Sequence, residues 1–176
     1  MLTIRRATPS DLIGLQEGNL SSLPENYQLM YFIYHQISWE PLLWVAVERG
    51  HIVGYVLSKM ETEGKKGKKT IKHGHITSIA VNRTHRRQGL ATKLMKLALR
   101  EMGRVFKAEY CSLHVRLSNV AAKHLYIDTL GFKKHETTEK YYADGEDAFE
   151  CRYYFSDVEK ELKAEEKEEK EEKEGK

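Results

Sequence analysis

The stretch Ile76-Thr77-Ser78-Ile79-Ala80-Val81-Asn82-Arg83-Thr84-His85-Arg86-Arg87-Gln88-Gly89-Leu90-Ala91 decides the fold of this 176-residue chain. It begins as a buried strand, passes through a basic turn that contains glycine, and opens a helix predicted over 89–106. A helix N-terminus presents unpaired N–H groups and a partial positive charge, so it attracts phosphate. Arg86 and Arg87 add positive charge, and Gly89 leaves room for a ligand to approach the backbone. The stretch therefore predicts an anion cradle, most simply for a pyrophosphate, although an ordinary turn with solvated arginines has the same residue types.

Further strands and helices are expected on both sides of this stretch. Strands are predicted at 2–7, 44–48, 52–61, 74–81, 110–115, 132–142 and 148–155, and helices at 10–20, 26–38, 89–106 and 118–130. Hairpins and helical crossovers alternate in this order, which predicts an α/β (α+β) domain. We expect a mixed central β-sheet of about seven strands flanked by about four helices. Within the helix at 26–38, residues 29–34 are apolar or aromatic all round, so the second face of this helix needs a partner chain or a substrate groove.

The charge of the chain is divided between two unlike parts. The whole sequence has 29 Lys and Arg against 26 Asp and Glu, a net charge of +3. Residues 156–176 hold 10 acidic and 6 basic side chains, so residues 1–155 carry a net charge of +7. This predicts one domain at 1–155, which is long enough to bury a core, and a charged tail at 156–176 that is disordered or a solvated helix.

Composition excludes several classes of protein. Cys111 and Cys151 are the two cysteines, too few for a disulfide framework or a multi-cysteine zinc site. No apolar run is long enough to span a bilayer, and no signal peptide is visible. His73 and His75 share a strand face, but no further ligands follow at a suitable spacing, so no metal is expected. We therefore expect a soluble cytoplasmic protein, with nuclear residence also open.

Two sequence patterns resemble the GNAT acetyltransferases. Arg86-x-x-Gly89-x-Ala91 has the spacing of that family's acetyl-CoA pyrophosphate loop, and Asn119-x-Ala121-x-x-x-x-Leu125-Tyr126-x-x-x-Leu130-Gly131-Phe132 is similar to its second conserved stretch. Five blocks resemble, more closely, the catalytic subunits of the NatA N-terminal acetyltransferase complex: LPENY at 23–27, GYVL at 54–57, HGHITS at 73–78, SLHVR at 112–116 and KYYADGEDA at 140–148. The resemblance covers nearly all of residues 1–155. The chain departs from those relatives in the lysine-rich loop at 64–72 and in the tail.

The resemblance implies transfer of the acetyl group of acetyl-CoA, as co-substrate, to the N-terminal α-amine of nascent polypeptides. It also implies a large helical-repeat auxiliary subunit, which docks on the ribosome and which we expect on the first two helices. Small first residues are the expected substrates with that subunit, and acidic N-termini without it. Two alternatives stay open: acetylation of lysine side chains or small amines, and a non-enzymatic ribosome- or RNA-binding module. The lysines at 65–72 suit RNA, although a solvated loop has the same composition.

The resemblance also carries over to individual residues. For acetyl-CoA it implies Ile79, Ala80, Val81, Arg86, Arg87, Gln88, Gly89, Leu90, Ala91, Thr92, Asn119 and Tyr126. For the peptide it implies Leu23, Pro24, Glu25, Tyr27, His75, Arg116, Tyr141 and Tyr142. The catalytic candidates are Glu25 as a base through water or as the residue that orders its loop, His114 in the proton relay, and Tyr126 as the acid for the leaving thiolate.

Each catalytic candidate also has a purely structural interpretation. Glu25 would favour the dipole of the second helix from its first turn. His114 and Arg116 point to one face of their strand. If that face meets the substrate groove, Arg116 would position Glu25 or the peptide; in the structural interpretation His114 is a hydrogen-bonded histidine packed under a helix and Arg116 is paired on the surface. Tyr126 lies on an apolar stripe and would pack in the core, with its hydroxyl in the cleft. The two tyrosines of the last block would be strand aromatics, one facing in and one out.

Overall fold

The computed structural model describes residues 1–64 and 70–155, so the lysines at 65–69 and the tail, with the predictions made for them, lie outside the described residues. The order of elements agrees with the sequence prediction. They are β1 (Leu2–Arg6), α1 (Leu12–Ser22), α2 (Leu29–Ser38), β2 (Trp44–Glu48), β3 (His51–Glu63), β4 (Ile71–Val81), α3 (Leu90–Arg104), β5 (Tyr110–Arg116), α4 (Val120–Lys123), β6 (Lys133–Thr138) and β7 (Ala148–Tyr154).

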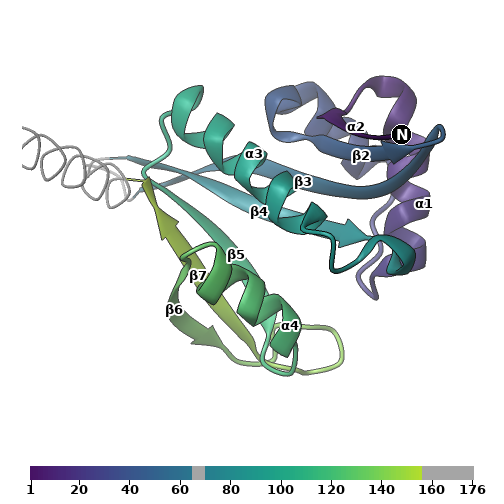
Figure 1. The fold of residues 1–176 in the computed structure, drawn as a ribbon. Coiled ribbons are helices and arrows are strands. Elements are labelled where there is room, and N and C mark those ends of the chain that lie inside the picture. Colours follow the sequence, from purple (N-terminus) through teal and green to yellow (C-terminus); the bar gives the residue numbers. More distant parts are fainter. Residues whose placement is uncertain (65–69, 156–176) are drawn as a thin grey trace, which may run out of the picture.

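One seven-stranded mixed sheet organises the chain, as predicted, in the order β1-β2-β3-β4-β5-β7-β6 (Figure 1). The described neighbours are antiparallel except β4 and β5, a parallel pair that α3 connects. Within the described residues these two strands pair only from His73 to His75 against Tyr110 to Ser112. Figure 1 shows them separating beyond that point. The edge of β4 from Ile76 to Val81 therefore has no β5 partner.

Helix α3 buries an apolar stripe against one face of the sheet. Leu94, Ala98 and Met102 recur at a spacing of four, as the sequence predicted, and are fully buried. They pack in the main core with Val56 of β3, and the segment after α4 joins the same core. A Cβ atom at Gly74 would overlap the Met102 side chain, so any larger residue there would force Met102 to move within the core.

Helices α1 and α2 cover the opposite face over β3 and its neighbours. Leu15 of α1 and Phe32 of α2 are buried against Tyr55 and Leu57 in a second core cluster. Side chains alternate along a strand, so Val56 points to α3 while its two neighbours point to α1 and α2. In Figure 1 the β5, β7 and β6 end of this second face has no covering helix among the described residues. That half of the sheet is open for a functional site.

A β-bulge interrupts β4 at Thr77. Leu57 of β3 pairs with Ser78, whereas the next residue, Ser58, pairs with Ile76, so Thr77 is an extra residue without a partner in β3. Bulges re-aim side chains and are common beside active sites. Here the bulge comes at the point where β4 and β5 have separated.

Several elements differ from their predicted bounds. Helix α2 begins at Leu29, so residues 23–28 form a connection and not the first turn of the second helix. The helix predicted at 118–130 has two parts, the short α4 and a π-helix at His124–Thr129. β6 ends at Thr138, before the predicted end at 142. Among the described residues, the structure has no helix with the length and apolarity to cross a membrane.

Asp11 ties the first strand to the first helix. Its carboxylate accepts hydrogen bonds from the Arg5 guanidinium at 2.6 and 2.9 Å and from the Thr8 backbone N–H at 2.8 Å. The Asp11 side chain is only 11% exposed. The hydrogen bonds from Arg5 are the main cause that lowers the pKa of Asp11 to about 2. The pair therefore stabilises the fold through the ionised carboxylate.

We predict that Asp11→Asn lowers the free energy of unfolding by about 1 to 2 kcal/mol at pH 7. Because the folded-state pKa is depressed, this stabilisation is present above the unfolded-state pKa of about 4 and is lost as the pH falls through about 2. Urea unfolding of both proteins between pH 7 and pH 3 measures the difference. The difference in the free energy of unfolding between the two proteins should become smaller below pH 4. A difference that does not change with pH would contradict an ionic origin.

Candidate active site

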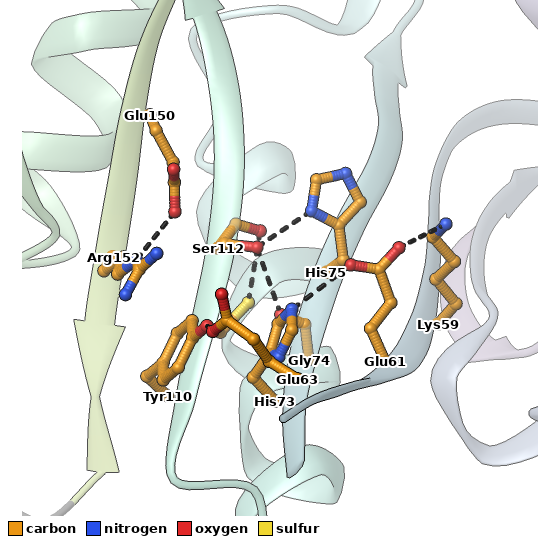
Figure 2. Close-up of polar contacts among 11 residues, drawn as sticks. Lys59, Glu61, Glu63, His73, Gly74, His75, Tyr110, Ser112, Glu150 and Arg152 are labelled. Carbon is orange, nitrogen blue, oxygen red and sulfur yellow. Dashed lines mark hydrogen bonds and ion pairs between the residues drawn. The ribbon is translucent and has the colours of Figure 1, made fainter. Parts of the chain in front are cut away.

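A cavity of about 760 Å³ opens on the face of the sheet that α3 does not cover. Its walls come from α2, β3, β4, β5, β7 and two connections that are far apart in the sequence. Four residues predicted for the site line it, namely Tyr27, His75, His114 and Tyr141. Figure 2 shows the polar contacts in part of its wall. The fold therefore brings together residues from four of the five sequence blocks.

His114 and His75 lie next to each other in this cavity. The His114 ring stacks on Tyr141, with centroids 4.2 Å apart and planes at 9°, and its centroid is 5.8 Å from that of His75. The Nδ1 atom of His75 is 2.9 Å from the Ser112 Oγ atom. Burial lowers the pKa of His75 to about 4 and also lowers the pKa of His114. Burial therefore favours the neutral form of both imidazoles near pH 7.

We predict that the imidazole of His75 stays neutral until the pH falls to about 4, because protonation would place a charge in a buried site. An NMR titration of the histidine ring signals measures the midpoint, and a His75→Asn variant assigns the signal. A free imidazole titrates near 6.5. A midpoint for His75 at or above that value would contradict desolvation as the controlling effect.

Arg116 gathers three carboxylates at the end of β5. Its guanidinium forms ion pairs with Glu25 at 2.5 Å, Asp144 at 2.7 Å and Glu146 at 2.8 Å. It also lies 3.9 Å from the centroid of the Tyr142 ring. Hydrogen bonds to Glu146 and Glu25 raise the pKa of Arg116, so its charge is permanent. This planar group holds two separate connections together, the one before α2 and the one between β6 and β7.

Glu25 lies in the connection between α1 and α2. The buried Asn19 fixes this connection, because its side chain donates to the Glu25 carbonyl and accepts from the Tyr27 N–H, both at 2.9 Å. The interpretation of Glu25 as a first-turn helix residue is therefore wrong. Leu23 and Pro24 begin the same connection, and Leu23 packs on the second core cluster. Arg116 was suggested to position Glu25 or the peptide, and the structure shows its contact with Glu25.

Aromatic side chains approach the cavity from two sides. Tyr27 stacks on Tyr31 with centroids 4.8 Å apart, and its hydroxyl donates to the Thr77 carbonyl at 3.5 Å. Burial raises the pKa of Tyr27 to about 12. From the opposite side, Tyr141 and Tyr142 meet edge to face at 5.1 Å. Both lie in the connection between β6 and β7, so their interpretation as strand residues is wrong.

The predicted anion cradle forms the N-terminus of α3. Gly89 is the N-cap, with φ +73°, and a Cβ atom there would meet no atom within 4 Å. Arg87 also has a positive φ of 64°. The Arg86 Nε atom donates to the Val81 carbonyl at 3.0 Å. In this stretch Arg86, Arg87 and Gln88 are exposed, Ala91 and Thr92 are half-buried, and Leu90 is buried.

These residues fit a ligand that carries a pyrophosphate. The loop combines exposed guanidinium groups with the N–H groups of the first turn of a 15-residue helix, and the space above Gly89 is open. Beside the loop, Ile79, Ala80 and Val81 pair with β3 along one edge of β4. Their other edge has no β5 partner within the described residues. An extended amide-bearing ligand can pair with such a free edge.

Tyr126 and Asn119 come from the segment that follows β5. Tyr126 is in the π-helix, only 8% exposed, and packs in the main core near Phe132. Burial raises the pKa of Tyr126, so the hydroxyl keeps its proton at neutral pH. Asn119 caps α4 by accepting from the Ala122 N–H at 3.0 Å. The predicted core packing of Tyr126 is confirmed, and its place in a π-helix is typical of functional sites.

Several groups at the site carry little signal in the sequence. Strand alternation places Ser112 on the same face as His114, and this would have been enough to find it. Asp144 and Glu146 come from a connecting loop, and nothing in the sequence shows that this loop returns to Arg116. Among residues 1–64 and 70–155, the structure shows no group of three or more side chains suited to bind a metal ion.

Comparison with known proteins agrees with this geometry. The acetyltransferase (GNAT) family matches residues 12–132. The Arabidopsis thaliana N-terminal acetyltransferase A complex catalytic subunit NAA10 is 57% identical over 153 residues, which is 86% of this chain and 77% of that protein. The Schizosaccharomyces pombe N-terminal acetyltransferase A complex catalytic subunit ard1 is 54% identical over 156 residues, 88% of this chain and 86% of that protein. A chain of the NatB acetyltransferase complex, solved with CoA bound, superposes with a TM-score of 0.71 at 32% identity, covering 86% of this chain and 98% of that one.

The chain therefore belongs to the acetyltransferase (GNAT) family. Within the family it groups with the catalytic subunits of N-terminal acetyltransferase A, which confirms the resemblance of the five sequence blocks.

Proposed function

We propose that this chain transfers the acetyl group of acetyl-CoA to the N-terminal α-amine of nascent polypeptides. The separation of β4 from β5 carries the proposal, because it leaves a free strand edge between the α3 loop and the histidines of the cavity. Family membership and the names of the two relatives support an N-terminal acetyltransferase. The CoA in the NatB structure supports acetyl-CoA as the co-substrate.

When bound, acetyl-CoA supplies the activated acetyl group. Arg86, Arg87 and the first-turn N–H groups of α3 would hold its pyrophosphate, and Gln88 to Thr92 shape that loop. The free edge at Ile79 to Val81 would hold the amide-bearing arm, with Asn119 as a further contact. Backbone N–H groups of β4 would also stabilise negative charge that develops on the acetyl oxygen.

The α-amine of the peptide must lose a proton before it attacks. Its unperturbed pKa is about 7.7 to 8.0, so a modest base is sufficient. Glu25 would accept this proton through a water molecule, in the orientation fixed by Arg116. His114, which burial keeps neutral, would share the relay. Tyr126 retains its proton at neutral pH and would give it to the leaving thiolate.

We predict that Glu25→Gln lowers kcat/KM about 100-fold with little change in Tm. The amide keeps a hydrogen-bond acceptor for Arg116 but cannot take up a proton, and the Glu25 side chain is 37% exposed. Asp144→Asn is the matched control, because it neutralises another carboxylate of Arg116 and leaves Glu25 intact. Its kcat/KM should fall by less than about tenfold. Equal losses in the two variants would show that Glu25 acts only through the Arg116 network.

Peptides with a free α-amine and an internal lysine test the reaction itself. Mass spectrometry should place the acetyl group on the α-amine. Acetylation confined to lysine would favour the alternative of a side-chain acetyltransferase, and no acetylation would contradict an enzyme of this type. We expect acidic first residues to be preferred by the free chain, and small first residues by its complex with an auxiliary subunit.

Two apolar stripes on α1 and α2 support such a partner. Ile13 and Leu20 of α1 are 64% and 56% exposed, and Met30, Tyr34 and Ile37 of α2 are 68%, 54% and 79% exposed. Their spacing places each set along one side of its helix. Exposed apolar surface of this kind marks a protein–protein contact. The partner would be the helical-repeat auxiliary subunit, which would link the enzyme to the ribosome in the cytoplasm.

We predict that Ile37→Asp weakens binding to the auxiliary subunit at least tenfold, because a charge would be buried in the contact. Val105→Asp is the control, since Val105 is also exposed but lies at the C-terminal end of α3. Co-purification and binding isotherms with the auxiliary subunit measure the effect. Unchanged binding of Ile37→Asp, with Tm unchanged, would place the contact elsewhere.

A further inference from the structure

The cavity extends well beyond the residues that the proposed reaction uses. One end holds Tyr141, His114 and Thr77, and the other end holds Tyr110 and Glu63. From Thr77 to His73 along β4 the distance is about 13 Å, since a strand rises about 3.3 Å per residue. An extended peptide of about four residues has the same length. A single small N-terminal residue occupies only a minor part of a space of about 760 Å³.

Polar contacts hold the far end of the cavity in place (Figure 2). The Glu61 carboxylate pairs with the Lys59 ammonium at 2.5 Å and with the His73 Nε2 atom at 3.2 Å. The Tyr110 hydroxyl donates to Glu63 at 2.9 Å, and the Tyr110 ring stacks on His73 with centroids 4.6 Å apart. His73 itself is 8% exposed. The side chains are therefore fixed in position before any ligand arrives.

The cavity as a whole carries one more carboxylate than permanent cation among the described residues. Its carboxylates are Glu61 and Glu63 at the far end and Glu150 opposite His114, and its permanent cations are Lys59 and Arg152. Lys59 is held by Glu61, and Arg152 is held by Glu150 at 2.6 Å. Glu63 also lines the cavity, and its hydrogen bond comes from the neutral hydroxyl of Tyr110, so this contact does not compensate its negative charge. A cation is therefore better accommodated here than an anion.

We propose that this far end, lined by Lys59, Glu61, Glu63, His73, Tyr110 and Arg152, is a subsite for the third and fourth residues of the peptide and prefers a basic side chain there. The inference rests on the proposed function, because the α-amine must lie beside His114 for the following residues to reach Glu63. The order of residues along β4 and β5 gives the direction in which the peptide would extend. On the cavity face, the pair nearest the reaction centre is His75 with Ser112, and the next pair outward is His73 with Tyr110.

Peptides that differ only at the fourth residue test the subsite. The first residue is the one that the enzyme acetylates best, and the fourth is Arg, Ala or Glu; Arg avoids competing acetylation of a lysine. For the full chain at low salt, kcat/KM should be about three- to fivefold higher with Arg than with Glu, mainly through KM. The preference should decrease as salt is added.

Charge-neutralising variants locate the effect. Glu63→Gln keeps an acceptor for Tyr110 and should bring the Arg-to-Glu ratio close to one. The double variant Glu61→Gln with Glu63→Gln should reverse the preference for Arg over Glu. In that variant the cavity keeps two permanent cations, Lys59 and Arg152, and one carboxylate, Glu150. Glu40→Gln is the matched control, an exposed carboxylate outside the cavity, and should leave the ratio unchanged. Circular dichroism and Tm establish that each variant is folded.

The possible failures are distinguishable. Equal kcat/KM for the Arg, Ala and Glu peptides, with all three acetylated at the α-amine, would overturn the subsite and leave the proposed function standing. A preference that Glu63→Gln and Glu40→Gln leave equally unchanged would overturn the assignment to this cavity. No acetylation of any peptide would overturn the proposed function itself. Because the first comparison uses the wild-type chain, it does not depend on the folding of a variant.

Discussion

The short parallel pairing of β4 with β5 is the constraint on which the rest of the structure depends. Two parallel strands need a long crossover, and α3 supplies it. Its start is therefore fixed at the end of β4, where the N–H groups of the first turn face the same region as the free strand edge. Because the pairing stops at His75, backbone groups of β4 stay available beside that helix start. One topological feature thus provides both the helix-start loop that we propose to bind phosphate and a free strand edge beside it.

The opposite face of the sheet is specialised because its helices cover only part of it. Under α1 and α2 the strands carry apolar side chains such as Tyr55 and Leu57, which pack as a core. Beyond them β4 and β5 carry His75 and His114, buried enough for both pKa values to fall. The change from core to site follows the bulge at Thr77. A fold that covered this half with a helix would gain apolar burial and lose the cavity.

The elements were predictable where local patterns decide them, and the site was predictable only in part. The spacing of Leu94, Ala98 and Met102 indicates α3 because burial of one helix stripe is a local requirement. The position of Glu25 was not predictable, since Asn19 and Arg116, rather than a helix start, determine it. The same holds for the carboxylates that return to Arg116 from the connection between β6 and β7, and for the π-helix. Contacts between loops leave no periodic trace in the sequence.

Charge separates the two substrates on the two sides of the free β4 edge. The loop that we propose for the anionic co-substrate presents Arg86, Arg87 and the helix start, and the carboxylate that reaches this loop, Glu48, contacts His85 at 3.1 Å. The peptide arrives with a protonated amine and meets a face where carboxylates outnumber permanent cations. His75 and His114 lie on the cavity side, and burial favours their neutral forms, so they add little charge to either region. The two local charge distributions, basic at the loop and acidic in the cavity, each match the charge of the substrate that we propose for that side.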